Sequence, residues 1–218
     1  MKILVACEFS GKVREAFRKL GHDAWSCDLL PADDHSPYHY ECDVLGILDK
    51  GWDLMVAHPP CTHLAVSGAR WFKYKQKEQA EALDFVQKLL DAPIERIALE
   101  NPISVISSRI RRPDQIIQPW MFGEDASKST CLWLKNLPSL TPTMLVEGRL
   151  YCCGLPLSEG LGMHGCPNCN GDKNAKRLYA NQTPSGQNKL APSKDRWKLR
   201  SETYQGIADA MASQWSKL

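Results

Sequence analysis

The chain has 218 residues, and its 27 lysines and arginines nearly balance its 25 aspartates and glutamates, which leaves a formal net charge of +2. A charge this small does not by itself indicate a nucleic-acid partner. No apolar run approaches the roughly 18–20 residues that a membrane span needs, so we expect no membrane contact. The opening segment, Met1–Ala6, is too short for a signal peptide, which favours a cytoplasmic, reducing location. The length fits one α/β domain with a small inserted module.

The first part of the chain alternates strand and helix patterns. Residues 2–7 form an apolar run that is typical of a buried parallel strand. A turn with glycine occupies residues 8–11, and residues 12–20 have apolar side chains at helical spacing. Residues 22–28 predict a second strand that ends on Asp28, and residues 42–44 follow as the end of a third. This order is the layout of a Rossmann-like nucleotide site: a strand, a glycine turn, a helix and a second strand that ends in an acid. In such a site the acid binds the ribose hydroxyls.

The turn at residues 8–11 lacks the G-x-G-x-x-G pattern that binds a pyrophosphate. A nucleoside ligand without a pyrophosphate, such as S-adenosylmethionine, does not need that pattern. The sequence therefore predicts an α/β, Rossmann-like fold with a site for a ligand of this kind.

Two later strands end in residues that can carry chemistry. The apolar residues 52–57 lead into the His-Pro-Pro-Cys sequence that ends at Cys61, and residues 96–99 lead into the Glu-Asn-Pro sequence that begins at Glu100. Between them, residues 76–90 predict a helix. Open α/β sheets bind ligands beyond the carboxyl ends of their strands, so we expect both sequences to face one pocket.

A cysteine and a glutamate together suit one demanding reaction. Cytosine accepts a group at C5 only after a nucleophile has made C6 tetrahedral, and a thiolate is a strong nucleophile near neutral pH. The ring also needs a proton or hydrogen bond at N3, which a glutamate kept protonated by burial can give. Cys61, Glu100 and a bound methyl donor would form the required set.

In their order along the chain, these segments resemble the DNA cytosine-5 methyltransferases. Residues 5–11 are similar to the first motif of that family, and Asp28 matches the acid after its second strand. Residues 43–44 match its acid–aliphatic pair, residues 53–61 its catalytic strand and Pro-Cys loop, and residues 98–102 its Glu-Asn motif. The gap of 39 residues between the cysteine and the glutamate (100 − 61) is similar to the gap in the family.

The resemblance implies a Rossmann-like, S-adenosylmethionine-dependent methyltransferase and assigns its site. At the reacting base it places Cys61 as nucleophile, Glu100 as acid partner, Asn101 as a loop-shaping residue and Lys128 as the stand-in for the family's arginine. The implied cofactor-binding residues are Phe9, Ser10, Gly11, Asp28, Asp43, Val44 and Pro60. An ordinary surface lysine is the alternative for Lys128. The chain departs from the family at Val13, where a second glycine is usual, and at Ile207, where asparagine is usual.

Residues 131–134 predict a further strand and residues 202–215 a final helix, but the pattern between them is irregular. We expect three domains: residues 1–137 as catalytic and cofactor-binding domain, residues 138–195 as a small target-recognition insertion, and residues 196–218 as a C-terminal helix that packs back on the first. The insertion is rich in lysine and arginine, which can contact DNA phosphates.

The insertion also holds a Cys-x-x-Cys sequence of the kind that binds zinc. The expected ligands of a structural zinc ion are Cys152, Cys153, Cys166 and Cys169. His164 is the alternative to Cys152, and thiols in an irregular reduced loop are the alternative to a zinc site.

These patterns predict methyl transfer to C5 of a cytosine that has left the DNA stack, since Cys61 cannot reach C6 inside a duplex. Two alternatives stay open: the same chemistry on a free cytidine nucleotide, and a catalytically degenerate, zinc-stabilised nucleic-acid-binding protein. The resemblance allows a protective, regulatory or hypermodifying role in a bacterial cell or a phage-infected host, including a place in restriction–modification. A monomer is favoured.

Overall fold

The computed structural model describes residues 1–152, 155–156 and 175–217. The chain divides into two compact units. The first comprises Met1–Ile117, Ser129–Thr141 and Ile207–Leu218, and the second comprises Gln118–Lys128 and Pro142–Gly206. The expected ranges 1–137, 138–195 and 196–218 assign functions as well as boundaries, and those assignments stay a prediction.

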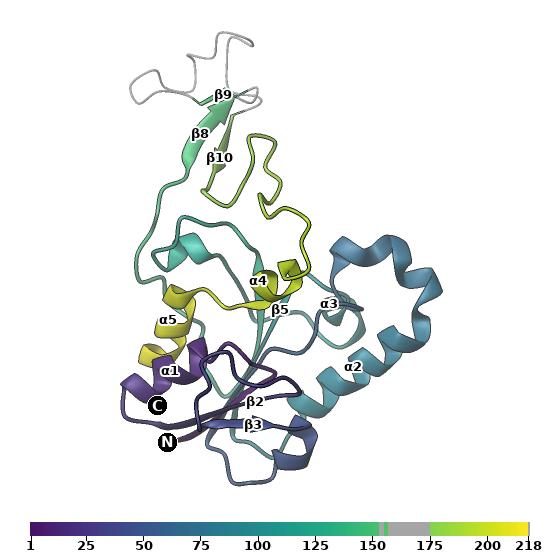
Figure 1. Ribbon diagram of the computed structural model, residues 1–218, viewed down its shortest axis with the longest axis vertical. Coiled ribbons are helices and arrows are strands. Elements are labelled where there is room, and N and C mark those ends of the chain that lie inside the picture. The colour runs from purple at the N-terminus through teal and green to yellow at the C-terminus, as the bar shows by residue number, and fades with distance from the viewer. Residues whose placement is uncertain (153–154, 157–174, 218) are drawn as a thin grey trace. The chain divides into compact units, whose positions relative to one another are not determined.

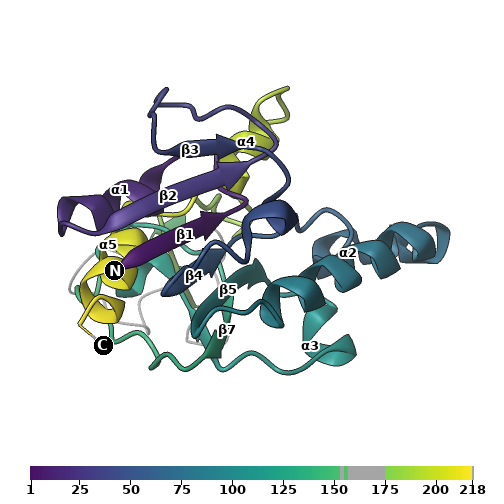
Figure 2. The same cartoon turned by 90° about the horizontal axis from the view of Figure 1, so that it is seen from below.

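A seven-stranded sheet forms the centre of the first unit (Figures 1 and 2). Its strands are β1 (Lys2–Ala6), β2 (Asp23–Asp28), β3 (His39–Glu41), β4 (Leu54–Ala57), β5 (Arg96–Pro102), β6 (Gln115–Ile117) and β7 (Thr130–Lys135). They lie in the order β3-β2-β1-β4-β5-β7-β6, with parallel pairs from β3 to β5 and an antiparallel β7. The run from β3 to β5 has the order of a doubly wound sheet. The expected α/β fold is confirmed at this level.

Three neighbouring strands, β1, β4 and β5, form the centre of this sheet. Their apolar residues are fully buried, which explains why the sequence shows continuous apolar runs and no alternation. Ala57 pairs with Ala6 on one side and with Leu99 on the other. Because the three strands are parallel and in register, the residues that follow them emerge together at the carboxyl edge of the sheet.

Helices cover both faces of the sheet, with α1 and α5 on one side and α2 and α3 on the other (Figure 2). The helices of this unit are α1 (Lys12–Lys19), α2 (Gln76–Leu90), α3 (Ile106–Arg109) and α5 (Gln205–Trp215), with 3-10 helices η1 (Val44–Ile47) and η2 (Val66–Tyr74). Val13, Ala16 and Phe17 of α1 are buried at helical spacing, as expected. None of the helices in the described residues is long and apolar enough to cross a membrane.

The second unit contains a small antiparallel sheet in the order β10-β8-β9 (Figure 1). Its elements are η3 (Pro119–Met121), β8 (Arg149–Cys152), β9 (Leu155–Pro156), β10 (Lys176–Leu178) and α4 (Arg196–Ser201). The rings of Trp120 and Tyr179 stack with their centroids 6.1 Å apart. The carboxylate of Asp125 accepts a hydrogen bond from the amide of Ala180 at 2.8 Å and forms an ion pair with Arg149 at 3.3 Å. Local polar contacts therefore hold much of this unit together.

The longer helices and most strands of the first unit match the sequence prediction, whereas η2, α3 and β6 are not predicted by the sequence and one expected strand end differs. Residues 42–44 do not end a third strand, because the strand is His39–Glu41 and Asp43 instead caps η1 by accepting a hydrogen bond from the amide of Leu45 at 3.0 Å. The irregular segment after residue 138 includes the strands of the small sheet. Strands this short contain too few residues to show an alternation of apolar and polar side chains in the sequence.

Gly206, near the start of α5, lies where no side chain fits. A Cβ atom there would stand 1.8 Å from the carbonyl oxygen of Phe122. We expect Gly206→Ala to lower the free energy of unfolding by about 2–4 kcal/mol, measured by urea denaturation, because backbone must move to admit the methyl group. The matched control is Gly46→Ala, where a Cβ would meet nothing within 4 Å. Equal denaturation midpoints for the two variants would contradict the close approach.

Candidate active site

The turn between β1 and α1 is organised by Glu8, whose carboxylate caps the helix. Oε1 accepts a hydrogen bond from the amide of Val13 at 2.7 Å, and Oε2 accepts one from the amide of Arg14 at 3.2 Å. The hydroxyl of Ser10 also donates to Glu8, at 3.3 Å. Unpaired amides at a helix N-terminus are a common anion site, so here a side chain of the chain itself occupies that position.

Gly11 closes this turn in a left-handed conformation with φ of 71°. A Cβ at Gly11 would lie within 3 Å of the guanidinium of Arg14, which is fully buried. That guanidinium donates to the hydroxyl of Ser26 at 2.8 Å and pairs with Asp34. Glycine at position 11 therefore leaves room for a buried cation that ties α1 to β2.

Burial raises the pKa of Glu8, because a carboxylate removed from water loses solvation. The charge of His58, the two helix amides and Arg14 act in the opposite direction. Glu8 is 5% exposed, so it is a buried acid whose charge depends on these neighbours.

The other expected cofactor residues lie at the same edge of the first unit. Phe9 is buried in the turn after β1. Asp28 ends β2, where its carboxylate accepts a hydrogen bond from the amide of Leu30 at 3.0 Å and burial raises its pKa. Asp43 is exposed at the start of η1, and Val44 beside it is buried. Their role as cofactor ligands stays a prediction.

The Pro-Cys loop and β5 are joined by two side-chain contacts. Nδ1 of His58 lies 3.1 Å from Oε2 of Glu100, and both side chains are about nine-tenths buried, at 8% and 10% exposure. Nδ2 of Asn101 donates to the carbonyl of Pro59 at 2.9 Å. Asn101 is 1% exposed. These contacts hold the residues just before Cys61 against the end of β5.

Backbone hydrogen bonds continue this attachment beyond Cys61. The amide of Val105 donates to the carbonyl of Leu64 at 3.0 Å, and the amide of Val66 donates to the carbonyl of Ile103 at 3.0 Å. The structure thus brings the loop that carries Cys61 and Pro60 alongside the segment that follows Glu100, at the carboxyl edge of the sheet.

The cysteines of the first unit differ sharply in exposure. Cys61 is exposed. Burial raises the pKa of Cys27 to about 12 and that of Cys131 to about 11, and it raises the pKa of Cys7 as well. A thiol must ionise to attack a ring carbon, so the raised pKa makes these three thiols poor nucleophiles.

Lys128 and the expected zinc ligands belong to the second unit. The ammonium of Lys128 donates to the carbonyls of Arg200, at 3.0 Å, and Glu202, at 3.4 Å, at the end of α4. Cys152 is buried at the end of β8. Cys153, His164, Cys166 and Cys169 lie outside the described residues. Within the described residues, no group of three or more His, Cys, Asp or Glu side chains is arranged to hold a metal ion.

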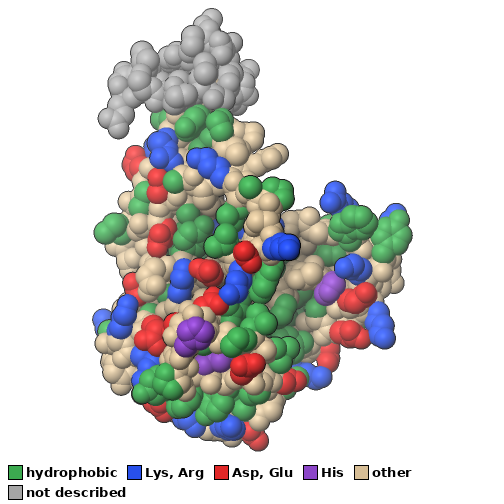
Figure 3. Space-filling model, in the orientation of Figure 1, with side chains coloured by type: hydrophobic (Ala, Val, Ile, Leu, Met, Phe, Trp, Pro, Cys, Tyr) green, Lys and Arg blue, Asp and Glu red, His purple; other side chains and the backbone are tan. Residues whose placement is uncertain are grey.

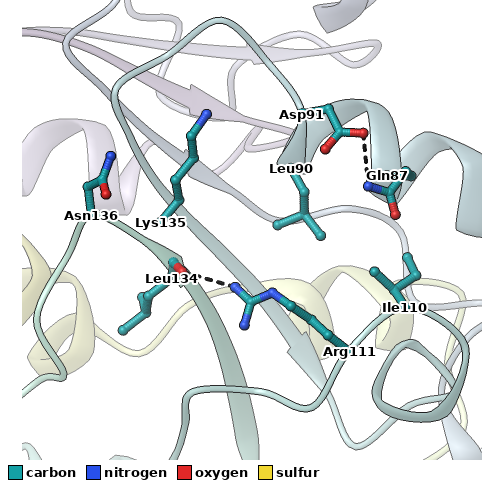
Figure 4. Close-up of a pocket in the computed structure, with 8 residues that line it drawn as sticks. All are labelled: Gln87, Leu90, Asp91, Ile110, Arg111, Leu134, Lys135 and Asn136. Atoms are coloured by element: carbon teal, nitrogen blue, oxygen red, sulfur yellow. Dashed lines mark hydrogen bonds between the residues drawn. The ribbon is translucent and has the colours of Figure 1, made fainter.

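A pocket in the first unit lies away from these residues (Figure 4). Its walls include Leu134 and Lys135 at the end of β7, where Lys135 pairs with the start of β5 at Ile97. Arg111 donates to the carbonyl of Leu134 at 2.9 Å, across the pocket wall drawn in Figure 4. This is the amino edge of the parallel strands, opposite to Cys61 and Glu100.

Sequence reasoning did not identify Glu8, His58 or Arg14 as site residues. A helix is usually capped by the side chain of its own N-cap residue, which here is Gly11. Glu8 lies three residues before Gly11, so the usual capping pattern does not point to it. His58 is visible as a polar residue at a strand end, but its pairing with Glu100 is a contact between strands.

No protein-family model and no curated protein matches the chain. Among solved structures, it is similar to a candidate DNA modification methyltransferase encoded within a prophage (E. coli). The identity is 14% and the TM-score 0.45, over 66% of this chain and 51% of that one. The chain therefore spans about half the length of that structure, and a likeness of this degree does not identify an activity.

The raised pKa of Glu8 predicts a pH-dependent cost in stability. Stability linked to Glu8 is fully present below its ordinary pKa of 4.5 and is lost as the pH rises through the raised pKa of the folded state. Relative to the wild type, Glu8→Gln should therefore gain stability as the pH rises above 4.5, by up to about 1.4 kcal/mol for each pH unit between the two pKa values. Urea denaturation across pH 4–8 measures this, and a difference that does not change with pH would contradict it.

Proposed function

We propose that this protein transfers a methyl group from S-adenosylmethionine to C5 of cytosine in DNA, through a covalent bond between Cys61 and C6. The observation that carries the proposal is the attachment of the Cys61 loop to the end of β5 through His58–Glu100 and Asn101–Pro59. It holds an exposed thiol and a buried acid on adjacent strand ends, as the reaction requires.

The topology supports the same class of reaction. The mostly parallel sheet, with helices on both faces, agrees with the Rossmann-like fold that the resemblance to methyltransferases implies. The exposed loops at its carboxyl edge carry the expected residues, and open α/β sheets bind ligands at that edge.

The turn after β1 fits a nucleoside cofactor that has no pyrophosphate. Glu8 already fills the N-terminus of α1, where a dinucleotide would place its phosphates, and its charge would repel them. S-adenosylmethionine avoids this conflict and, when bound, supplies a methyl group on a positively charged sulfur. Phe9, Ser10 and Gly11 would line its site, and Asp28 would accept hydrogen bonds from the ribose hydroxyls. The other parts of the cofactor would contact Asp43, Val44 and Pro60.

The residues of this chain then divide the reaction as follows. The thiolate of Cys61 forms a bond to C6, and the electron pair of the C5–C6 double bond moves to the bond between C4 and C5. The pair of the C4–N3 double bond moves to N3, which takes a proton from the acid form of Glu100. C5 takes the methyl group. A base or water then removes the C5 proton, the bond to Cys61 breaks, and the proton at N3 returns to Glu100. Asn101 holds the carbonyl of Pro59 and so fixes the loop that presents the thiol.

An exposed aromatic and basic segment favours DNA over a free nucleotide as substrate. In η2, Trp71 is 53% exposed and Tyr74 is 68% exposed. Arg70 lies 5.1 Å from the ring centre of Trp71, and Lys73 lies 4.6 Å from that of Tyr74. Figure 3 shows hydrophobic and basic side chains next to one another on this part of the first unit, at the right of the view. Aromatic faces stack on unpaired bases and cations neutralise phosphates, whereas a single nucleotide needs only an enclosed pocket.

The remaining assignments are part of the same proposal. Lys128 is proposed to orient the base, in addition to its hydrogen bonds to the end of α4. The cysteines Cys152, Cys153, Cys166 and Cys169 are proposed to hold a structural zinc ion, since a metal would stabilise a polar segment with little core. An exposed Cys61, in a loop attached to the strand that carries the buried Glu100, disfavours the catalytically degenerate DNA-binding alternative.

Two substitutions test the chemistry. Cys61→Ala should abolish methyl transfer while the affinity for S-adenosylmethionine, measured by calorimetry, stays within about twofold. Glu100→Gln should lower kcat on the order of 10²- to 10⁴-fold, because the amide cannot give a proton to N3. Transfer of radiolabelled methyl to duplex DNA, followed by bisulfite sequencing, measures activity and position together.

The matched control for Cys61→Ala is Cys42→Ala, a partly buried thiol on the loop after β3. Methylation by Cys61→Ala at the wild-type rate would remove the covalent mechanism. Labelled dCMP as acceptor in place of DNA would reveal the nucleotide alternative.

The aromatic segment gives a separate prediction about the substrate. Trp71→Ala and Tyr74→Ala should each weaken binding of single-stranded DNA by about 1–3 kcal/mol, the usual loss for one stacked base, with less effect on cofactor binding. Leu20→Ala is the control, because Leu20 is 51% exposed at the end of α1, similar to Trp71, but has no aromatic ring to stack on a base. Fluorescence anisotropy at fixed salt measures the affinities, and unchanged binding by both aromatic variants would contradict this surface.

A further inference from the structure

His58 lies among two buried acids that come from neighbouring strands. On one side its Nδ1 is 3.1 Å from Oε2 of Glu100. On the other side it interacts with the carboxyl group of Glu8, whose pKa it lowers through its charge. The side chains of His58, Glu8 and Glu100 are each about nine-tenths buried or more. Water therefore screens their charges little, and the electrostatic interaction between them is strong.

The register of the sheet produces this arrangement. Ala6 of β1, Ala57 of β4 and Leu99 of β5 pair in one row, and the amide of His58 donates to the carbonyl of Ala6 at 2.9 Å. The next residue of β4 therefore enters between the ends of the two outer strands. Because β4 lies between β1 and β5, position 58 follows a strand whose two neighbours carry Glu100 near the end on one side and lead into Glu8 on the other.

One nitrogen of the imidazole ring needs an explanation beyond packing. Nε2 of His58 is buried and has no hydrogen-bond partner among the described residues. A buried ring nitrogen without a partner is costly unless it serves to take or give a proton. Other titratable groups act on this set. Arg14 adds a positive charge near Glu8, and Cys131 of β7, the strand partner of Asn101 in β5, is a buried thiol whose raised pKa keeps it protonated.

We propose that His58 is a positioning residue for Glu100, which orients the carboxyl group through Nδ1 and stabilises the carboxylate formed when Glu100 gives its proton to the substrate ring. This inference rests on the proposed methyl transfer. When the proton moves from Glu100 to N3, the hydrogen bond from Nδ1–H to Oε2 becomes one to a carboxylate and strengthens. When the proton returns, the bond weakens again, so no proton is gained or lost. Glu8 balances any positive charge that the imidazole takes.

The kinetic test separates orientation from simple packing. His58→Ala should lower kcat on the order of 10- to 100-fold with a smaller change in KM, because it removes a hydrogen bond to a charged group that exists in the transition state. His58→Asn keeps a donor near the position of Nδ1 but cannot take a proton. It should recover most of the lost kcat and change the shape of the kcat–pH profile, which a merely structural residue would not do.

The matched control is His22→Asn, since His22 lies before β2 at the amino edge of the sheet with its Nδ1 3.3 Å from the N-terminal amine. It should leave kcat and the pH profile as in the wild type. If His58→Asn and His58→Ala both match the wild type, the inference is overturned while the proposed methyl transfer stands. If His58→Ala does not fold, His58→Asn decides.

A second measurement does not depend on activity. With ¹⁵N-labelled histidine, NMR of the full chain should show a protonated, hydrogen-bonded Nδ1 for His58, and its resonance should move in Glu100→Gln but not in Cys61→Ala. An unchanged resonance in Glu100→Gln overturns the pairing. A wild type that methylates neither DNA nor dCMP overturns the proposed function and with it the catalytic meaning of the pair, and the NMR result then shows whether the pair itself exists.

Discussion

The in-register pairing of three buried parallel strands is the constraint on which the rest of this structure depends. Residues 3–6 of β1, 54–57 of β4 and 97–99 of β5 are apolar and completely buried, so a shift of one residue in any of them would draw a polar residue that flanks the run into the core. The same register fixes where each strand ends. Glu8, His58 and Glu100 meet at one edge because their strands are aligned by hydrophobic burial.

Burying two carboxyl groups and an imidazole has a free-energy cost, and the fold offsets it locally. Two amides at the start of α1 and the hydroxyl of Ser10 bind Glu8, and His58 binds Glu100. Helix amides and their dipole stabilise negative charge at such a position. Three buried side-chain atoms in this part of the first unit have no hydrogen-bond partner among the described residues: Nε2 of His58, Oδ1 of Asn101 and Oγ of Ser104. Several unpartnered polar atoms gathered at the end of two strands are more typical of a reactive site than of a packed core.

Continuous apolar runs made the central strands predictable, and apolar residues at helical spacing made the helix Gln76–Leu90 predictable, because burial leaves a direct trace in the order of residues. The short strands β3 and β6 leave almost no trace, since three residues cannot show a period. The residues of the candidate site could be proposed from their places at strand ends. Their partners could not, because the contact from His58 to Glu100 joins positions 42 residues apart and depends on strand order.

The structure also gives a physical reason for the two departures from the methyltransferase pattern. A second glycine is useful where a ligand approaches the helix backbone, but here Val13 has its amide bound by Glu8 and its side chain fully buried against the sheet. Ile207, at the place of the usual asparagine, is 2% exposed and packs into the core of its unit. At position 13 a buried apolar side chain stands where glycine would leave space, and at position 207 an apolar side chain stands in place of a polar one. The carboxylate of Glu8 supplies the polar group that the helix start needs. The turn after β1 is therefore closed by the protein itself, which restricts the ligand at this edge to one that brings no phosphate to the helix.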